Sequence, residues 1–325
     1  MSSTADTILG YNILILLAVV TTGILAGECP SDPKILAPCE CKPFNETFNY
    51  INCAEYVELD VLGVFKNLSK ALEGKTKQFY QIRFSNKLIE YLPANAFADI
   101  EFQEVYVSFA SRMTRFHANA LNGTRNTVTK LIVERSPIED NNGTDDNDLF
   151  KAVRQLTRLK QFELSWSHVT EIPAGAFQSH PTLERLKFYD NLQMIKVGQQ
   201  AFSQLKNLFY ISIETSDINA ISGEAFSQES DEREFIVRLD GNDKAVFPPE
   251  AFQAIKRPVN LHLTKDDLSP YDFHYIPEST YKPFLDQHPK HRIFSTLGSG
   301  DCSDKRNDWL RNRNPKQWFD ENCSY

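Results

Sequence analysis

The residues of this chain that could do acid–base, metal or thiol chemistry are seven histidines, six cysteines and many carboxylates. The closest pair of histidines, His288 and His291, is separated by Pro289, which disfavours a helix that would point both rings at one metal ion. The acidic stretch 136–148 lacks the order of aspartate, asparagine and glycine that defines a calcium loop, which favours a solvated surface loop. The sequence therefore predicts no metal site and no cofactor.

Signatures of catalysis are also missing from the sequence. It contains no G-x-S-x-G elbow, no H-E-x-x-H motif, no phosphate-binding loop and no dinucleotide fingerprint. A chain with 43 acidic residues contains carboxylate pairs by chance, and no spacing marks one pair as a general acid and base. We therefore expect a protein that is not an enzyme.

The six cysteines lie near the two ends of the chain, at Cys29, Cys39, Cys41, Cys53, Cys302 and Cys323. An even number confined to the ends of a secreted chain is typical of disulfide-bonded caps. A zinc site in residues 39–53 is disfavoured because that stretch has no paired C-x-x-C elements. The sequence by itself leaves three pairings open for the four N-terminal cysteines.

The N-terminal residues indicate secretion. An uninterrupted apolar run, residues 13–20, fits the core of a signal peptide, although no Lys or Arg precedes it and Asp6 is acidic. We expect a signal peptide over residues 1–27 and an extracellular protein; an uncleaved anchor is the alternative. No later segment predicts a membrane span. In a secreted chain the predicted glycosylation sites are Asn45, Asn67, Asn122 and Asn142, whereas the sequon of Asn322 contains Cys323 and is the least favourable.

Composition narrows the class of partner. A chain with 41% hydrophobic and 12% aromatic residues is not disordered. Its net charge of −8 argues against nucleic acid or an anionic membrane as the partner.

The elements that would position a binding site come from a repeat, seen in "PAGAFQSHPTLERLKFYDN" at residues 173–191. An alanine–phenylalanine element recurs about every 25 residues, with a double gap around residues 149–150. A short pair of apolar residues at i, i+2 recurs in step, at Ile82/Phe84, Val105/Val107, Leu131/Val133, Phe162/Leu164, Leu186/Phe188, Ile211/Ile213, Val237/Leu239 and Leu261/Leu263. Three positions later most copies carry a small polar residue such as Asn191, which can hydrogen-bond a turning backbone.

This pattern resembles the leucine-rich-repeat family over residues 81–266. The resemblance implies an α/β solenoid, a horseshoe of about eight repeats with a parallel, concave β-sheet and disulfide-bonded caps at both ends. The apolar pair of each strand would point into the core, and the residue between them, such as Lys187, would point outward. The expected boundaries are an N-terminal cap at 28–78, repeats at 79–270 and a C-terminal cap at 271–325.

The two ends resemble the caps of extracellular members of that family. For the N-terminal end the resemblance implies the bridges Cys29–Cys41 and Cys39–Cys53, with residues 50–52 as an edge strand. At the C-terminal end, Trp309 and Leu310 match the family's Trp-Leu pair. Gly300 stands where the family has a cysteine and a fourth cysteine is missing, which leaves Cys302–Cys323 as the expected bridge.

Further stretches resemble one arthropod group within the family. They are "IPESTYKPFLD" at 276–286 and "DCSDKRNDWL" at 301–310, together with the A-x-A-F endings. The group comprises secreted proteins similar to the non-catalytic leucine-rich-repeat subunit of a decapod shrimp luciferase. The resemblance implies a role in binding or stabilising a partner and does not imply light emission.

Exposed side chains on the outward positions of the sheet are the candidate binding residues. They are Tyr106, Phe109, Trp166, Tyr189 and Tyr210, together with Glu163 and Lys187. Exposed aromatic residues on a rigid sheet are common anchors for protein partners, although they could also stack on one another and merely cover the sheet. We expect a secreted, non-enzymatic protein that binds an extracellular protein through its concave face. The alternative is an accessory subunit that stabilises a secreted oxygenase, luciferase-like, or another enzyme.

Overall fold

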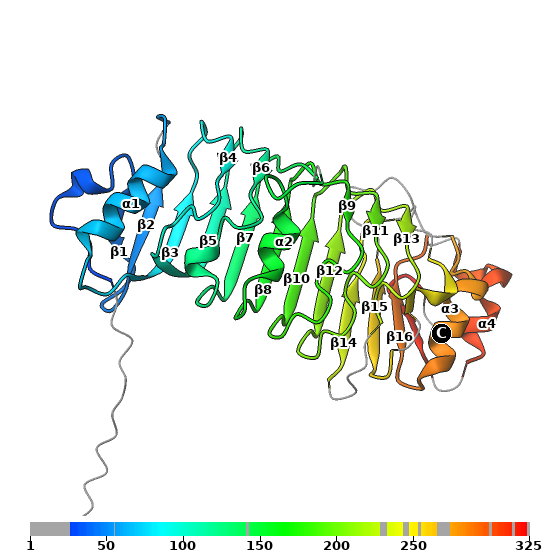
Figure 1. Cartoon of the computed structure of the whole chain (residues 1–325). Helices are drawn as coiled ribbons and strands as arrows, with labels where there is room; N and C mark the ends of the chain where they lie inside the picture. Colours follow the sequence, from blue (N-terminus) through cyan, green and yellow to red (C-terminus); the bar gives the residue numbers. More distant parts are fainter. Residues whose placement is uncertain are drawn as a thin grey trace, which may run out of the picture.

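The computed structural model describes residues 27–54, 56–140, 143–227, 233–242, 247–252, 255–264, 274–298, 301–313 and 316–323. Residues 1–26 of the expected signal peptide and the predicted glycosylation site Asn142 lie outside this part of the chain. The described residues form one elongated stack of coils, with the N-terminal cap at one end and the C-terminal cap at the other (Figure 1). In that part of the chain no helix is long and apolar enough to cross a membrane.

A twelve-stranded sheet runs the whole length of this stack (Figure 1). In sheet order its strands are β1 (Glu40–Pro43), β2 (Asn49–Cys53), β3 (Gln78–Phe84), β5 (Glu101–Ser108), β7 (Lys130–Glu134), β8 (Gln161–Ser165), β10 (Arg185–Tyr189), β12 (Tyr210–Glu214), β14 (Phe235–Arg238), β15 (Val259–Leu263), β16 (Arg292–Ser295) and β17 (Trp318–Asp320). The pairing is parallel throughout except between β1 and β2, which form an antiparallel hairpin. The fold is a leucine-rich-repeat solenoid, and its eight repeat strands are the eight that the sequence predicts.

The register between strands confirms the predicted inward pairs. Leu186 of β10 pairs with Phe162 of β8 and Ile211 of β12, and all three side chains are fully buried. The residue that follows each of them points to the outward face, because side chains alternate along a strand. A one-residue shift of this register would exchange the core residues with the outward residues, so burial specifies the register strongly.

The other side of the core is built from short strands and stacked rings. The short strands are β4 (Tyr91–Leu92), β6 (Arg115–Phe116), β9 (Glu171–Ile172), β11 (Lys196–Val197) and β13 (Ala220–Ile221). The phenylalanines of the A-x-A-F element stack from coil to coil, with ring centroids 5.9 Å apart for Phe177–Phe202 and 5.4 Å for Phe202–Phe226. The coils approach closely here: a Cβ on Gly198 would lie 2.4 Å from the backbone nitrogen of Ala174.

Helices replace or extend this ring stack where the sequence departs from the repeat. They are α1 (Val61–Ala71), α2 (Leu149–Arg154), α3 (Glu278–Gln287) and α4 (Asp308–Arg311), with 3-10 turns η1 (Pro33–Ile35), η2 (Asn122–Thr124), η3 (Pro249–Phe252), η4 (Asp301–Ser303) and η5 (Lys305–Asn307). The Asp148 side chain caps α2 by accepting a hydrogen bond from the Lys151 N–H at 2.8 Å. In α3, Phe284 continues the stack with its ring 4.9 Å from that of Phe252.

The predicted polar column satisfies the backbone where coils leave their strands. Asn191 is fully buried and accepts hydrogen bonds from the backbone N–H and the hydroxyl of Ser167, at 3.0 and 2.8 Å. Its amide also donates to the Leu164 carbonyl at 2.9 Å. In the first repeat Lys87 occupies the position three residues after Phe84, and the role falls to Asn86 instead, which accepts hydrogen bonds from the N–H groups of Leu88 and Ile89.

The N-terminal cap contains both expected bridges, Cys29–Cys41 and Cys39–Cys53. One detail of the prediction is wrong: residues 50–52 lie in β2, which is an interior strand. The edge is β1, which covers β2 as a hairpin. Cys41 of the Cys29–Cys41 bridge lies within β1, and Cys39 of the Cys39–Cys53 bridge directly precedes it.

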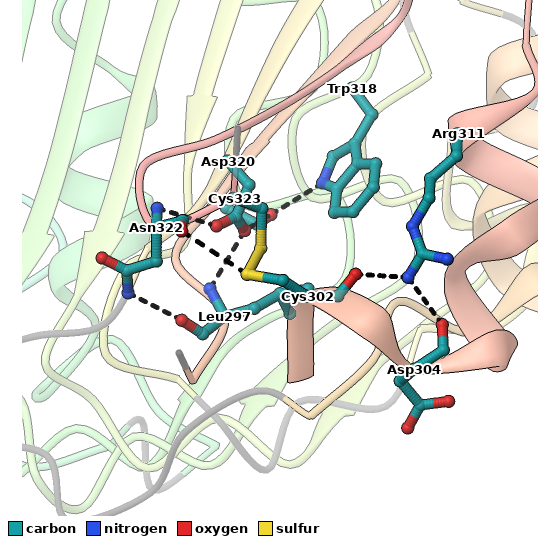
Figure 2. Close-up of a disulfide and its surroundings, with 9 residues drawn as sticks. Leu297, Cys302, Asp304, Arg311, Trp318, Asp320, Asn322 and Cys323 are labelled. Atoms are coloured by element: carbon teal, nitrogen blue, oxygen red, sulfur yellow. Dashed lines mark hydrogen bonds between the residues drawn. A yellow bond between two sulfur atoms is a disulfide. The ribbon is translucent and has the colours of Figure 1, made fainter. Parts of the chain in front are cut away.

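The C-terminal cap is held by Cys302–Cys323 and by buried polar contacts (Figure 2). The indole N–H of Trp318 donates to the Ser295 hydroxyl at 2.9 Å, and the Asp320 carboxylate accepts from the Leu297 N–H at 3.0 Å. Arg311 donates to the carbonyls of Cys302 and Asp304. These contacts fix β16 and β17, so the sheet continues through the cap, which the sequence pattern does not predict.

Candidate partner-binding surface

The outward side chains of the main sheet form columns, because each strand is in register with the next. One column contains Arg83, Tyr106, Ile132, Glu163, Lys187, Ser212, Arg238 and His262. The next contains Ser108, Glu134, Ser165, Tyr189 and Glu214. The candidate residues can therefore be placed relative to one another from this register.

The residue that follows the strand has a positive φ in five consecutive coils. The angles are 58° at Phe109, 46° at Arg135, 52° at Trp166, 54° at Asp190 and 47° at Thr215. Because the same conformation recurs at the same coil position, we attribute it to the geometry of the coil. A left-handed conformation costs about 1–2 kcal/mol for most residues, and Asn, Asp and Gly tolerate it best. Backbone energetics therefore account for Asp190 but not for Phe109, Arg135 or Trp166.

Those three residues form a stack along the edge where the strands end. The guanidinium carbon of Arg135 lies 5.2 Å from the ring centroid of Phe109 and 5.2 Å from that of Trp166. The two rings stay 49% and 45% exposed, so one side of the stack faces solvent. Each cation–π contact at an exposed site contributes about 0.5–1 kcal/mol, which offsets part of the backbone cost. We call Phe109, Arg135 and Trp166 the edge stack.

Tyr189 lies next to the edge stack on the following strand. It pairs in register with Ser165, the residue before Trp166. Burial raises the pKa of Tyr189, and the Glu163 and Glu134 carboxylates raise it further, which places both carboxylates close to the phenol. Lys187 pairs in register with Glu163 but forms no ion pair with it. Trp166, Tyr189, Glu163 and Lys187 are thus brought together as the sequence predicts.

Two predicted residues lie elsewhere on the sheet. Tyr106 is half-buried, and its hydroxyl accepts a hydrogen bond from Lys130 Nζ at 2.8 Å. Tyr210 pairs with Arg185 at the start of β12, whereas Tyr189 pairs with Glu214 at its end. Four residues of strand, about 13 Å, therefore separate Tyr210 from the level of Tyr189. Tyr210 does not join the edge stack.

Arg135 is not among the candidate binding residues predicted from the sequence. Its position directly after the strand, equivalent to those of Phe109 and Trp166 in the neighbouring repeats, could have indicated it. Arg135 follows Glu134, which pairs with both Ser108 and Ser165, so Arg135 lies between Phe109 and Trp166. The alternative that the aromatic rings of this edge stack on one another does not hold for the described residues: a guanidinium, and not a second ring, covers each of Phe109 and Trp166.

The histidine pair has a structural role. His291 is fully buried, its Nδ1 accepts a hydrogen bond from the Val259 N–H at 3.1 Å, and its ring stacks on Phe284 at 4.5 Å. Burial, and secondarily the nearby His288, lowers the pKa of His291 to about 3. Within the described ranges no group of three or more His, Cys, Asp or Glu side chains is arranged to hold a metal ion.

The fold and this surface define the class as a leucine-rich-repeat solenoid with disulfide-bonded caps and an exposed aromatic edge. Residues 148–253 match the BspA-type leucine-rich repeat region in six copies. The chain is also similar to the Oplophorus-luciferin 2-monooxygenase non-catalytic subunit of Oplophorus gracilirostris, with 23% identity over 221 residues. The aligned region covers 66% of this chain and 56% of the relative. The chain therefore spans just over half the length of the relative that it matches.

Proposed function

We propose that this chain is a secreted, non-enzymatic binding module that contacts an extracellular protein with its concave face. The observation that carries the proposal is the edge stack, an exposed Phe–Arg–Trp arrangement on three consecutive coils. Trp, Tyr and Arg are the residues most enriched in binding hot spots. The stack occupies backbone positions that favour smaller residues, so a role in binding explains these side chains better than stability does.

The positions of the predicted glycosylation sites are consistent with the concave face as the binding surface. Asn45 is exposed in the turn of the β1–β2 hairpin, and Asn67 is exposed on α1, which packs on the other side of the core from the sheet. Asn122 is half-buried in η2 and donates to Asn95 Oδ1 at 3.2 Å. None of these three is on an outward strand position. Glycans at these sites would leave the edge stack accessible. Three disulfides in the described residues also fit an oxidising, extracellular compartment.

A second candidate function is that of an accessory subunit. The relative from Oplophorus is named as the non-catalytic subunit of a monooxygenase, which favours an enzyme as the partner. In this version the chain would stabilise a secreted oxygenase, luciferase-like, or another enzyme, and would itself supply no catalytic residue.

The experiment is co-purification from secreted material, followed by a binding assay with any stoichiometric partner. Trp166→Asn, which suits the positive φ, and Tyr189→Ala should each weaken binding at least about tenfold, which corresponds to about 1.4 kcal/mol. Gln178→Arg, an exposed change on a turn of the convex side, serves as the matched control and should bind normally. Normal binding by both sheet-face variants, with loss of binding in the control, would contradict the proposal. A partner with enzymatic activity would favour the accessory-subunit version.

A further inference from the structure

Basic side chains gather where the strands of the C-terminal half of the sheet begin. The register places the first residues of β8, β10, β12, β14, β15, β16 and β17 along one edge of the sheet. Exposed lysines and arginines lie at these first residues or in the four residues before them: Arg158, Lys160, Arg185, Lys206, Arg233, Lys256, Lys290, Arg292 and Lys316. We call this set the basic edge. It lies opposite the edge stack, which follows the strand ends.

The basic edge reverses the average charge of the chain. The whole chain has 43 acidic and 35 basic residues. In the four residues before each of these strands, by contrast, the described carboxylates are Glu184 and Glu234. Within the described ranges Lys160 is the one member of the basic edge that forms an ion pair, with Glu184 at 3.0 Å. The other members keep their positive charges without a paired carboxylate there.

Two arginines of the basic edge are held close together despite their like charges. The guanidinium groups of Arg185 and Arg233 cover the ring of Phe209 from the coils on either side, at 4.7 and 3.9 Å from its centroid. Burial, and secondarily the charge of Arg233, lowers the pKa of the neighbouring Arg257 to about 10. The stack on Phe209 orders both exposed guanidinium groups, so that binding costs them less side-chain freedom. An anion at this site would relieve the repulsion between the like charges.

We infer that the basic edge binds a linear sulfated polysaccharide, at a site separate from the concave face of the proposed function. At least one cation lies on every coil from β8 to β17, and neighbouring coils are about 4.8 Å apart, so the array extends over about 29 Å. A linear polymer with an anionic group on successive units can contact several of these cations at once. Arg185 and Arg233 can donate paired hydrogen bonds to an oxyanion such as sulfate, and the lysines add point charges.

The surroundings favour a polysaccharide over a nucleic acid. Single-stranded nucleic acids bind with bases that stack on exposed aromatic rings. Two guanidinium groups cover Phe209, and Phe319 lies between Lys316 Nζ at 5.5 Å and the ring of Phe294, so neither offers a free face to a base. The three disulfides of the described residues fit an extracellular location, and clusters of Lys and Arg are a signature of heparin-type binding.

The test uses the full secreted protein and a fluorescently labelled, heparin-derived octasaccharide in an anisotropy titration. The octasaccharide should bind, and its affinity should fall steeply between about 50 and 200 mM salt, because binding releases counterions. The desulfated octasaccharide should not bind. Arg185→Gln/Arg233→Gln should weaken binding of the sulfated probe at least about tenfold, since each arginine loses a charge-assisted hydrogen bond. Lys290→Gln/Arg292→Gln, at the other end of the basic edge, should also weaken it.

The matched control is Lys66→Gln/Lys70→Gln, which removes the same two charges from exposed positions of α1. This variant and Trp166→Asn, at the opposite edge of the sheet, should bind the octasaccharide as the wild type does, and circular dichroism should show that every variant is folded. Absence of binding, equal binding of the desulfated probe, or an equal loss in the α1 control would overturn the inference. So would tighter binding of a DNA duplex, polyglutamate or a phosphatidylserine vesicle through the same two arginines.

Discussion

Replacement of Asn191 by alanine tests how the coils are held together. Asn191 is fully buried where the chain leaves β10, and its side chain bonds two neighbouring backbone segments. It accepts from the Ser167 N–H at 3.0 Å and donates to the Leu164 carbonyl at 2.9 Å. Alanine would leave both backbone groups without this partner in a site closed to solvent.

The expected loss of stability follows from these two groups. A buried polar group that loses its partner costs about 1–3 kcal/mol. The Ser167 hydroxyl also loses its acceptor, although its oxygen still accepts a hydrogen bond from the Val169 N–H at 3.4 Å. We therefore expect Asn191→Ala to lower the free energy of unfolding by about 3 kcal/mol.

The assay is urea unfolding followed by circular dichroism, with the disulfides intact. Asn207→Ala is the matched control, because the exposed Asn207 also donates to a backbone carbonyl, that of Pro181 at 2.7 Å. Asn207→Ala should lower the free energy of unfolding by no more than about 0.5 kcal/mol, as surface substitutions usually do. Hydrogen exchange at the Ser167 amide should accelerate in Asn191→Ala only. Equal unfolding energies for the two variants, or an unchanged Ser167 amide, would refute this account of the asparagine column.

Two further predictions concern the core. Leu186→Asp should block folding and secretion, because it buries a carboxylate without a partner. Lys187→Ala, one residue later, should change the free energy of unfolding by no more than about 0.5 kcal/mol. Equal secretion yields and melting curves for the two variants would mean that the assigned strand alternation is wrong. Burial lowers the pKa of His291 to about 3 from an ordinary value of 6.5. Between these pH values the unfolded chain binds more protons, so stability falls as the pH falls below 6.5. From pH 7 to 5.5 the wild type should lose about 1 kcal/mol more than His291→Asn, whose amide oxygen can replace Nδ1; parallel losses in urea unfolding would contradict this role.

Much of this fold could be predicted from the sequence because its rules are local. The i, i+2 apolar pairs repeat at a nearly constant interval, and strand alternation converts each pair into core residues. The same local logic predicts an outward Lys187 and an Asn191 that hydrogen-bonds the turning backbone, and both predictions are confirmed. The positions of the cysteines likewise predict that the bridges lie in the caps.

The caps show where local rules end. The sequence does not predict that β1 forms the edge, because an antiparallel hairpin depends on how residues 40–53 fold back between two disulfides. Nor does it predict β16 and β17, whose place in the sheet depends on contacts such as that between Trp318 and Ser295. These strands lack the repeat pattern, and only the packed cap gives them their register.

The candidate surface divides in the same way. The sequence by itself determined which side chains point outward, because that depends on alternation within one strand. The tertiary structure alone decided which of them meet: it places Arg135 between Phe109 and Trp166, buries Ser165 beside Tyr189, and holds Tyr210 apart. The physical reason is that neighbours on adjacent coils lie about 4.8 Å apart in space but a full coil apart in the chain. Their meeting depends on the length and closing turn of every coil between them.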